Sequence, residues 1–199
     1  MTQDTHAKQA TRDRVRALTA NLSTDDRRCK SALACERLFK EEWFQRASAI
    51  MLYLPMPGEV DVTSIALRCF QTGRVVCVPR MDWDHHRMTP IEIRSFHGHF
   101  AVRRHGVREP DEGRPVSLDE IDLVVAPGLA FDADCHRLGR GGGFYDRFLA
   151  HPSLARAARV GICFDEQIVE STHPEPHDAR LDGVLTDRRT VRTACPRLA

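Results

Sequence analysis

Apolar residues recur at helical spacing in the first part of the chain. Val15, Leu18 and Leu22 fall on one face of a helix predicted for residues 5–22. Ser23 followed by Asp26 is typical of a helix N-cap with an acidic third position, so a second helix is expected to begin there. The apolar residues that this region is expected to turn inward are Ala32, Leu33, Leu38, Phe39 and Trp43. The pattern therefore predicts two N-terminal helices.

Short continuous apolar runs come next, and turn-forming residues bound each of them. Residues 49–54 (AIMLYL) predict a buried strand that a Pro-Met-Pro-Gly turn closes. A helix is expected over residues 61–71, with Gly73 as its stop, and residues 75–78 (VVCV) predict a second buried strand that Pro79 ends. Strand, helix and strand in this order indicate a parallel βαβ unit.

The second half of the chain continues the alternation. Strands are expected near residues 91–96, over 121–126 (IDLVVA), near 160–164, and near 184–186 or Val191. A helix is expected over residues 145–150, and the polar, histidine-rich residues 82–120 are expected to form long loops or a flap. The pattern predicts an α/β fold, with residues 1–199 as a single three-layer α/β/α domain around a mostly parallel, Rossmann-like sheet.

Composition and charge narrow the function classes. The formal net charge is +1, from 29 basic and 28 acidic side chains, which gives no global field for nucleic acid or anionic lipid. A basic face of Lys8, Arg12 and Arg16 on the first helix is too little for a nucleic-acid binder, and a solvated helix face is the more ordinary explanation of it. No stretch reaches the roughly 18 apolar residues of a membrane span, so we expect a cytoplasmic protein with no membrane partner.

Cysteine and histidine do not indicate a metal centre of their own. The seven cysteines are widely spread with no Cys-x-x-Cys pair, which favours buried, reduced thiols. The ten histidines, among them His97, His99, His173 and His177, stand in no HExxH frame and have no accompanying cysteines. We therefore expect no zinc site.

The chemistry of the chain is concentrated in residues 122–149, where a strand runs through a long loop into a glycine-rich segment and a helix. Gly139, Gly141, Gly142 and Gly143 permit positive φ and close backbone approach. Arg137, Arg140 and Arg147 can donate charged hydrogen bonds to phosphate oxygens. A plain flexible loop is the alternative, but the flanking strand and arginines favour an anion site.

Two common phosphate motifs do not describe this loop. GRGGGF fails G-x-G-x-x-G because Phe144 stands at the last glycine position, and no lysine follows Lys40 to complete G-x-x-x-x-G-K-[ST]. The loop is therefore neither a standard Rossmann nor a Walker loop.

The same residues resemble the signature of the 5-formyltetrahydrofolate cyclo-ligase family, which is close to PG-x-x-FD-x-x-G-x-RLG-x-G-x-GYYDR. Residues 127–132 read PGLAFD and residues 137–147 read RLGRGGGFYDR. The likeness extends to Lys8 and Arg12 (K-x-x-x-R), residues 53–61 (YLPMPGEVD), residues 78–80 (VPR), and His177-Asp178 with Asp182. Two departures stand out, since Cys135 replaces a glycine and Phe144 replaces the first tyrosine of YYD.

The resemblance implies a role for each matched residue. It implies contacts to ATP, the co-substrate, from Lys8, Arg12, Arg137, Leu138, Gly139, Arg140, Gly141, Gly142, Gly143, Phe144 and Tyr145. It implies contacts to folate from Met56, Glu59, Asp61, Phe144 and Tyr145, with Arg140 and Tyr145 as catalytic residues. It also implies a Mg²⁺ ion near Asp146 and Asp182, although a helix-capping acid and surface carboxylates are the alternatives, and Asp178 is a further candidate.

The function that the resemblance implies is ATP-dependent cyclisation of 5-formyltetrahydrofolate to 5,10-methenyltetrahydrofolate, with release of ADP and phosphate. Because the protein would orient reactants and stabilise charge, no protein nucleophile is needed. The alternative is a divergent relative that binds nucleotide or folate without turnover, which the Cys135 departure favours. A monomer is our working expectation, and a preference for polyglutamylated folates stays open.

Overall fold

The computed structural model describes residues 3–96 and 100–193 and contains a central sheet of seven strands. The inner strands are β1 (Ala49–Met51), β2 (Val75–Asp82), β6 (Leu123–Ala126), β9 (Ala158–Ile162) and β10 (Gly183–Leu185). These five run parallel, while β3 (Arg87–Ile93) and β11 (Thr190–Arg192) pair antiparallel at the two edges. The order is β11-β10-β9-β6-β1-β2-β3, so the mostly parallel sheet expected from the sequence is confirmed.

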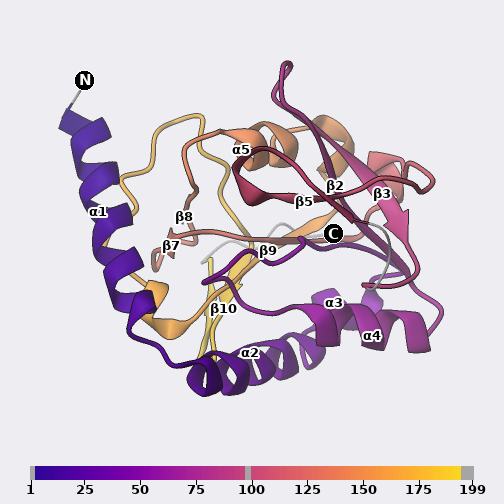
Figure 1. Cartoon of the computed structure of the whole chain (residues 1–199), viewed down its shortest axis with the longest axis horizontal. Coiled ribbons are helices and arrows are strands. Elements are labelled where there is room, and N and C mark those ends of the chain that lie inside the picture. The colour runs from indigo at the N-terminus through magenta and orange to yellow at the C-terminus, as the bar shows by residue number, and fades with distance from the viewer. Residues whose placement is uncertain (1–2, 97–99, 194–199) are drawn as a thin grey trace.

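Helices cover both faces of the sheet, as Figure 1 shows. On one side lie α2 (Thr24–Phe39), α3 (Glu42–Arg46) and α4 (Thr63–Gln71), and on the other lies α5 (Phe144–Leu149). Adjacent strand residues point to opposite faces, so Ile50 packs in the core with α2 and α4, whereas Met51 packs with α5. All residues of β1 and β6 are buried, because helices cover both faces of the sheet at these strands. This explains why their sequences are continuous apolar runs. The α/β/α layering is confirmed.

The two N-terminal helices are also confirmed, with a correction to the inner face of the second. The first, α1, spans Gln3–Ala20, and α2 begins after a capping box in which Ser23 and Asp26 exchange hydrogen bonds. Ala32 and Leu33 were expected inward but are exposed. The buried positions of α2 are Ser31, Ala34, Cys35 and Leu38, because the helix is rotated to place its small residues against α4 and the sheet.

Pro79 does not end β2, contrary to the expectation from the sequence. The strand continues to Asp82, and Pro79 stands opposite Pro90 of β3. On its other side β2 pairs with β1 only as far as Cys77, so no neighbouring strand requires the hydrogen bond that proline cannot donate.

Residues 82–120 are more ordered than the expected loops. They contain β3, a hairpin of β4 (Phe100–Val102) and β5 (Arg108–Pro110), and two 3₁₀ turns at Arg104–Gly106 and Leu118–Glu120. β3 begins four residues earlier than the strand expected near residues 91–96. The polar composition concealed these strands because β3 is an edge strand of the central sheet and β4 and β5 form a separate two-stranded sheet, so none of them is buried on both faces.

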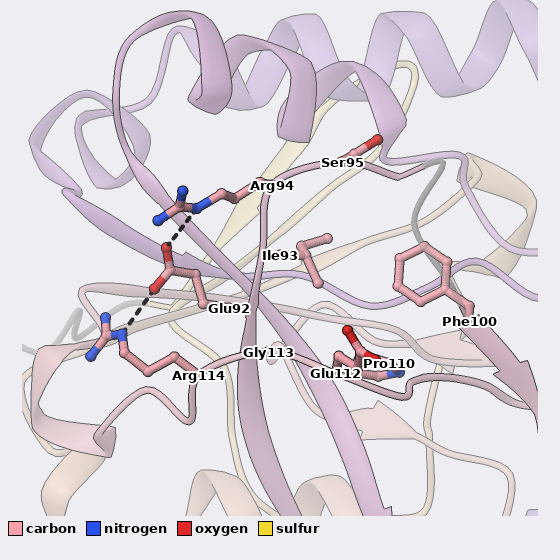
Figure 2. A pocket seen from close by; sticks show the side chains of 9 residues that line it. All are labelled: Glu92, Ile93, Arg94, Ser95, Phe100, Pro110, Glu112, Gly113 and Arg114. Atoms are coloured by element: carbon pink, nitrogen blue, oxygen red, sulfur yellow. Dashed lines mark hydrogen bonds and ion pairs between the residues drawn. The ribbon is translucent and has the colours of Figure 1, made fainter.

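A hollow of about 440 Å³ lies where this hairpin meets β3 (Figure 2). Its apolar wall comes from Ile93, Phe100 and Pro110, and Glu92 on its rim pairs with Arg94 and Arg114. None of the residues implied by the family resemblance lines it.

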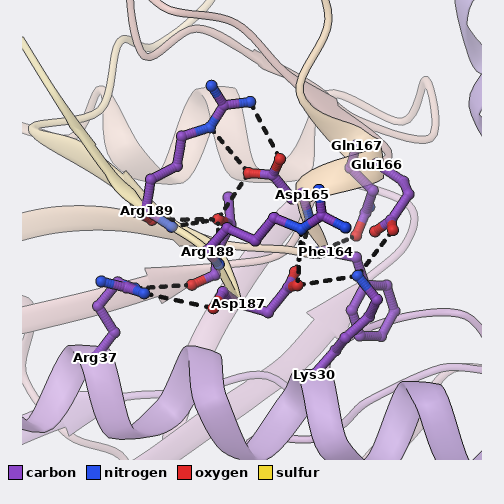
Figure 3. A network of polar contacts seen from close by, with 10 residues as sticks. Lys30, Arg37, Phe164, Asp165, Glu166, Gln167, Asp187, Arg188 and Arg189 are labelled. Atoms are coloured by element: carbon purple, nitrogen blue, oxygen red, sulfur yellow. Dashed lines mark hydrogen bonds and ion pairs between the residues drawn. The ribbon is translucent and has the colours of Figure 1, made fainter.

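A polar network fastens α2 to the carboxyl ends of β9 and β10 (Figure 3). Lys30 donates to Glu166 at 2.8 Å and to Asp187 at 2.9 Å, and Arg37 donates to the backbone carbonyls of Thr186 and Asp187. Because Asp187 is nearly buried, the Lys30 ammonium supplies the opposite charge that its carboxylate needs there. Hydrogen bonds from Lys30 overcome the effect of burial and lower the pKa of Asp187.

The cysteines behave as the sequence predicts. All six that the structure describes are free thiols, and five are buried, with Cys29 exposed. Burial raises the pKa of Cys35, Cys69 and Cys135 to about 11 and that of Cys77 to about 12, so these thiols stay protonated. His97, His99 and Cys195 lie outside the described residues. Among the helices in the described part of the chain, none has the length and apolar character to cross a membrane.

Candidate active site

The glycine-rich segment lies beyond the carboxyl end of β6. After β6 the chain forms a short hairpin of β7 (Ala130–Phe131) and β8 (Arg137–Leu138), and residues 139–143 then lead into α5. Gly141 has φ +104° and Gly143 has φ +66°, conformations that residues with a side chain rarely adopt. Gly141 and Gly142 are exposed, so their backbone is accessible to a ligand at the edge of the sheet where α/β folds usually bind one.

Helix α1 lies against this segment and contributes Arg12 to it. Arg12 Nε donates to the carbonyl oxygen of Gly139 at 3.0 Å, and Val15 packs with Ala130 and Leu138 of the hairpin. The side chain that the sequence identified on a basic helix face is therefore held at the glycine loop, although 127 residues separate the two along the chain.

Lys8, one turn earlier, is paired with two carboxylates. Its Nζ lies 2.6 Å from Glu175 and 2.8 Å from Asp178. Burial works against the charge of Lys8, but hydrogen bonds to the two carboxylates raise its pKa. For Asp178, burial also opposes the charged form, but hydrogen bonds from Lys8 and the Glu175 backbone lower the pKa. Both groups are therefore charged at neutral pH.

Arg140 reaches the segment that follows β1. Its guanidinium donates to Glu59 Oε1, with Nη2 at 3.0 Å, while Glu59 Oε2 accepts from the backbone N–H of Met56. Asp61 accepts from the backbone and hydroxyl of Thr63, and its own N–H donates to Ser31 on α2. The structure thus joins the predicted folate residues Met56 and Glu59 to the predicted phosphate loop.

Arg137 is turned away from the loop surface. Its side chain is buried and donates to Asp146 at 2.7 Å, and its guanidinium lies 5.4 Å from the ring centre of Tyr145. Leu138 is buried as well. We interpret Arg137 and Leu138 as the base that supports the loop, with Arg140 as the loop arginine nearest the surface.

The hydroxyl of Tyr145 is buried and has no hydrogen-bond partner in the described part of the chain. Burial, with the Glu59 carboxylate as a lesser cause, raises the pKa of Tyr145 far above its ordinary value. The hydroxyl therefore keeps its proton and can donate a hydrogen bond to a bound molecule.

Phe144 completes the site by packing against the turn between β2 and β3. Its ring centre lies 5.2 Å from that of Trp83 and 5.3 Å from that of His86, and Trp83 Nε1 donates to the buried Glu109 at 2.9 Å. An aromatic residue without a hydroxyl is sufficient for this packing. Trp83, His86 and Glu109 were not predicted, and a lone tryptophan in a polar stretch was the only signal that could have indicated them.

The two predicted magnesium ligands have separate partners. Asp146 pairs with Arg137, whereas Asp182, at the amino end of β10, is buried and accepts from the backbone N–H of Arg159 at 2.7 Å. Glu175, His177 and Asp178 bring possible ligand atoms within 4.8 Å of one another, but Lys8 already pairs with both carboxylates. As arranged, these acids do not form a ready magnesium site.

Fold and loop together define a class: a three-layer α/β protein with a glycine and arginine loop at the carboxyl edge of a parallel sheet. The sequence profile of the 5-formyltetrahydrofolate cyclo-ligase family matches residues 4–187. The chain belongs to this family.

Individual relatives agree with that assignment. A 5-formyltetrahydrofolate cyclo-ligase of Mycolicibacterium smegmatis is 35% identical over 71% of this chain and 75% of its own length. The mouse protein of the same name is 27% identical over 90% of this chain and 93% of its own. The NMR structure of Aquifex aeolicus 5,10-methenyltetrahydrofolate synthetase superimposes with a TM-score of 0.79 at 27% identity, covering 96% of this chain and 95% of that one.

Proposed function

We propose that the chain catalyses the ATP-dependent cyclisation of 5-formyltetrahydrofolate to 5,10-methenyltetrahydrofolate, with release of ADP and phosphate. The observation that carries the proposal is the meeting of two distant segments, α1 and the segment after β1, at the glycine loop. Arg12 of α1 binds the Gly139 carbonyl, and Glu59 after β1 binds Arg140. The names of the relatives supply the substrate class.

The proposed reaction passes through a phosphorylated substrate. The formyl oxygen attacks the γ-phosphorus of ATP, and ADP leaves. The nitrogen N10 then attacks the activated formyl carbon and loses its proton, and the carbon–oxygen bond breaks to release phosphate. ATP is needed because the formyl oxygen is a poor leaving group until it carries a phosphoryl group.

The residues of the chain hold phosphate charge and orient the two reactants. Gly139 through Gly143 offer backbone N–H groups, and Lys8, Arg12 and Arg140 offer cations to the phosphates. When a ligand binds, Arg140 can exchange Glu59 for the transferred phosphoryl group. Glu59 is then available to pair with the amino and ring N–H groups of the pterin, beside Met56, Asp61 and Phe144.

Tyr145 is proposed to donate its hydrogen bond to the folate or to the transferred phosphoryl group. A buried hydroxyl without a partner costs about 1–3 kcal/mol, and a ligand acceptor would remove that cost. Because the phenol stays protonated, it serves as a donor and not as a general base.

Magnesium remains a proposal with Asp146 as its ligand. Asp182, the other carboxylate that the resemblance implied, is not retained, because it lies at the amino end of β10, away from the glycine loop at the carboxyl edge of the sheet. Carboxylate oxygens suit Mg²⁺, which proteins usually bind together with substrate phosphates. Since Arg137 holds Asp146, coordination would require Arg137 to share or release this carboxylate. We assign no step to the ion.

The test is turnover by purified protein with Mg²⁺, ATP and 5-formyltetrahydrofolate, followed by the near-ultraviolet absorbance of the methenyl product and by ADP release. Arg140→Ala should lower turnover and raise the ATP concentration needed. Arg46→Ala, on the exposed end of α3, is the matched control and should behave as the unmodified protein. Absence of both product and ADP would refute the proposal.

The alternative, a relative that binds without turnover, depends on Cys135. This residue has φ +63°, in the left-handed region that glycine favours. A cysteine in this conformation is compatible with a turn that a glycine could also form, which favours the active enzyme. Thermal stabilisation by ATP and folate without product would favour the alternative.

We propose the cytoplasm as the location, supported by the free thiols of the described cysteines, which suit a reducing compartment. One plant relative is named a mitochondrial enzyme. A monomer in solution also remains our proposal, to be checked by sedimentation or light scattering.

A further inference from the structure

A second hollow, of about 360 Å³, opens between α2 and the segment that follows β1. Arg27 and Arg28 line it on the α2 side, and Glu59 and Asp61 line it on the other. Its volume falls within the roughly 300–1,000 Å³ of ordinary ligand pockets. None of the residues implied by the family resemblance comes from its α2 side.

The two arginines have donors to spare. Arg27 Nη2 donates to the carbonyl of Thr19 at 2.8 Å, but its Nε is buried and has no partner in the described part of the chain. Arg28 is largely exposed, at 79%, and its nearest acid is the equally exposed Asp25 at 3.5 Å. A surface pair of this kind is weak and can be displaced. Lys30, the next cation on α2, is fully engaged with Glu166 and Asp187.

Glu59 connects this hollow with the glycine loop. One of its oxygens accepts from Arg140, and the residue also lines the hollow beside Asp61. If the head group of a bound molecule pairs with Glu59, the rest of that molecule can lie either over the glycine loop or along α2. The phosphate donors occupy the first direction, which leaves α2 for the rest of a folate.

A folate carries its charge at the end opposite the pterin. The pterin is joined through a flat p-aminobenzoyl ring to glutamate, which has two carboxylates, and polyglutamylated forms add one carboxylate for each further residue. Guanidinium groups are the natural partners of carboxylates because they donate two parallel hydrogen bonds. Ala32, which is small and exposed, leaves room for the flat ring beside the arginines.

We propose that Arg27 and Arg28 bind the glutamate carboxylates of the folate substrate, and that Arg28, at the exposed mouth of the hollow, favours polyglutamylated forms. The inference rests on the proposed function for the identity of the substrate. It adds a subsite on α2 that determines how tightly glutamylated folates bind and takes no part in phosphoryl transfer.

The test compares three probes that differ only in the tail: 5-formyltetrahydropteroate, which has no glutamate, the monoglutamate, and a pentaglutamate. Calorimetric binding without ATP and steady-state kinetics with ATP are measured for each. Arg28→Ala and the double variant Arg27→Ala/Arg28→Ala should weaken binding of the glutamylated probes about tenfold, with KM raised and kcat kept. Their affinity for the pteroate should stay the same.

The controls separate this inference from the proposed function. Arg46→Ala removes one positive charge, as Arg28→Ala does, but from α3. It should leave the affinities for all three probes unchanged. Since Arg27 also joins α1 to α2 through Thr19, Arg28→Glu serves as the variant that spares the fold and should reduce pentaglutamate affinity most. Equal losses for the pteroate, or no loss for any probe, would overturn the subsite. If binding depends on the glutamate tail but no product forms, the subsite on α2 is supported and the proposed enzymatic activity is refuted.

Discussion

At the scale of single residues, removal of the Tyr145 hydroxyl should affect catalysis but not the stability of the fold. Because it is buried without a partner, Tyr145→Phe should leave the free energy of unfolding unchanged or raise it by about 1 kcal/mol. The same change should lower kcat/KM about tenfold or more, since the donor to the bound substrate is lost. Denaturant unfolding and steady-state kinetics on one preparation measure both.

Tyr53, the other tyrosine of the chain, is the matched control. Its hydroxyl donates to the carbonyl of Val60 at 2.8 Å, so Tyr53→Phe should cost about 1 kcal/mol of stability. Loss of stability in Tyr145→Phe with normal kinetics would mean that its hydroxyl has a structural partner and no ligand.

Cys135 offers a second test at the scale of one residue. Its backbone is left-handed, which costs a residue with a side chain about 1 kcal/mol, but its side chain is fully buried. Cys135→Ala keeps the strain and loses packing, whereas Cys135→Gly removes the strain. Glycine should therefore be less destabilising than alanine, as denaturant midpoints would show.

Cys163, a buried cysteine after β9, is the control for this comparison. It is not among the four described non-glycine residues with positive φ, so alanine should be less destabilising than glycine there. There glycine should be worse than alanine by about 1 kcal/mol. If alanine were also the better replacement at position 135, the left-handed backbone would be without energetic consequence.

At the scale of elements, α1 is fastened to the segment that precedes β10 by the ion pairs of Lys8 with Glu175 and Asp178. The pKa of Asp178 is lowered, so its contribution is present above the ordinary aspartate value near 3.9 and is lost as pH falls through the lower folded value. The pKa of Lys8 is raised, so its contribution is present below about 10.4 and is lost as pH rises through the higher folded value.

Lys8→Met should therefore cost about 1 kcal/mol between roughly pH 5 and pH 9, a modest value because the group of charges is partly solvated. The difference from the unmodified protein should shrink as pH falls below the ordinary aspartate value and vanish once Asp178 is protonated in the folded protein. Unfolding by urea across this range measures it. Arg16→Met, on an exposed pair of the same helix, should show little difference at any pH, and a pH-independent loss in Lys8→Met would contradict the ion-pair account.

The sequence predicted those elements whose signals are local. A capping box at Ser23 and continuous apolar runs in β1 and β6 identify helices and buried strands because each depends on neighbours along the chain. The strand through Pro79 and the edge strand β3 depend on which strand lies beside them, and no local pattern records that. The inward face of α2 likewise depends on its packing against α4.

At the scale of the whole molecule, the family resemblance assigned distant residues to one site, and the structure brings some of them together but not Asp182, which lies at the amino end of β10. The contacts of Arg12 with Gly139 and of Arg140 with Glu59 join residues that the resemblance had assigned to one site. Trp83, His86 and Glu109 support Phe144 from a turn that no motif marked. The pairing of Arg137 with Asp146 also could not be read from spacing, because phosphate binding explains an arginine in such a loop equally well.

The position of α1 across the loop gives a prediction for the whole fold. A ligand that binds only the folded protein raises stability by about 2.7 kcal/mol at one hundred times its dissociation constant. On the proposed function, ATP and 5-formyltetrahydrofolate should each raise the melting temperature. Arg12→Ala should lose most of the increase with ATP but keep that with folate, because Arg12 contacts the loop and not the segment of Glu59.

Arg16→Ala, one turn further along the same helix and paired only at the surface, should keep both increases. Loss of both in Arg12→Ala would show that Arg12 holds the fold of the site as a whole. Loss of neither would place the nucleotide away from α1, and the convergence of α1 on the glycine loop would then be a matter of packing alone.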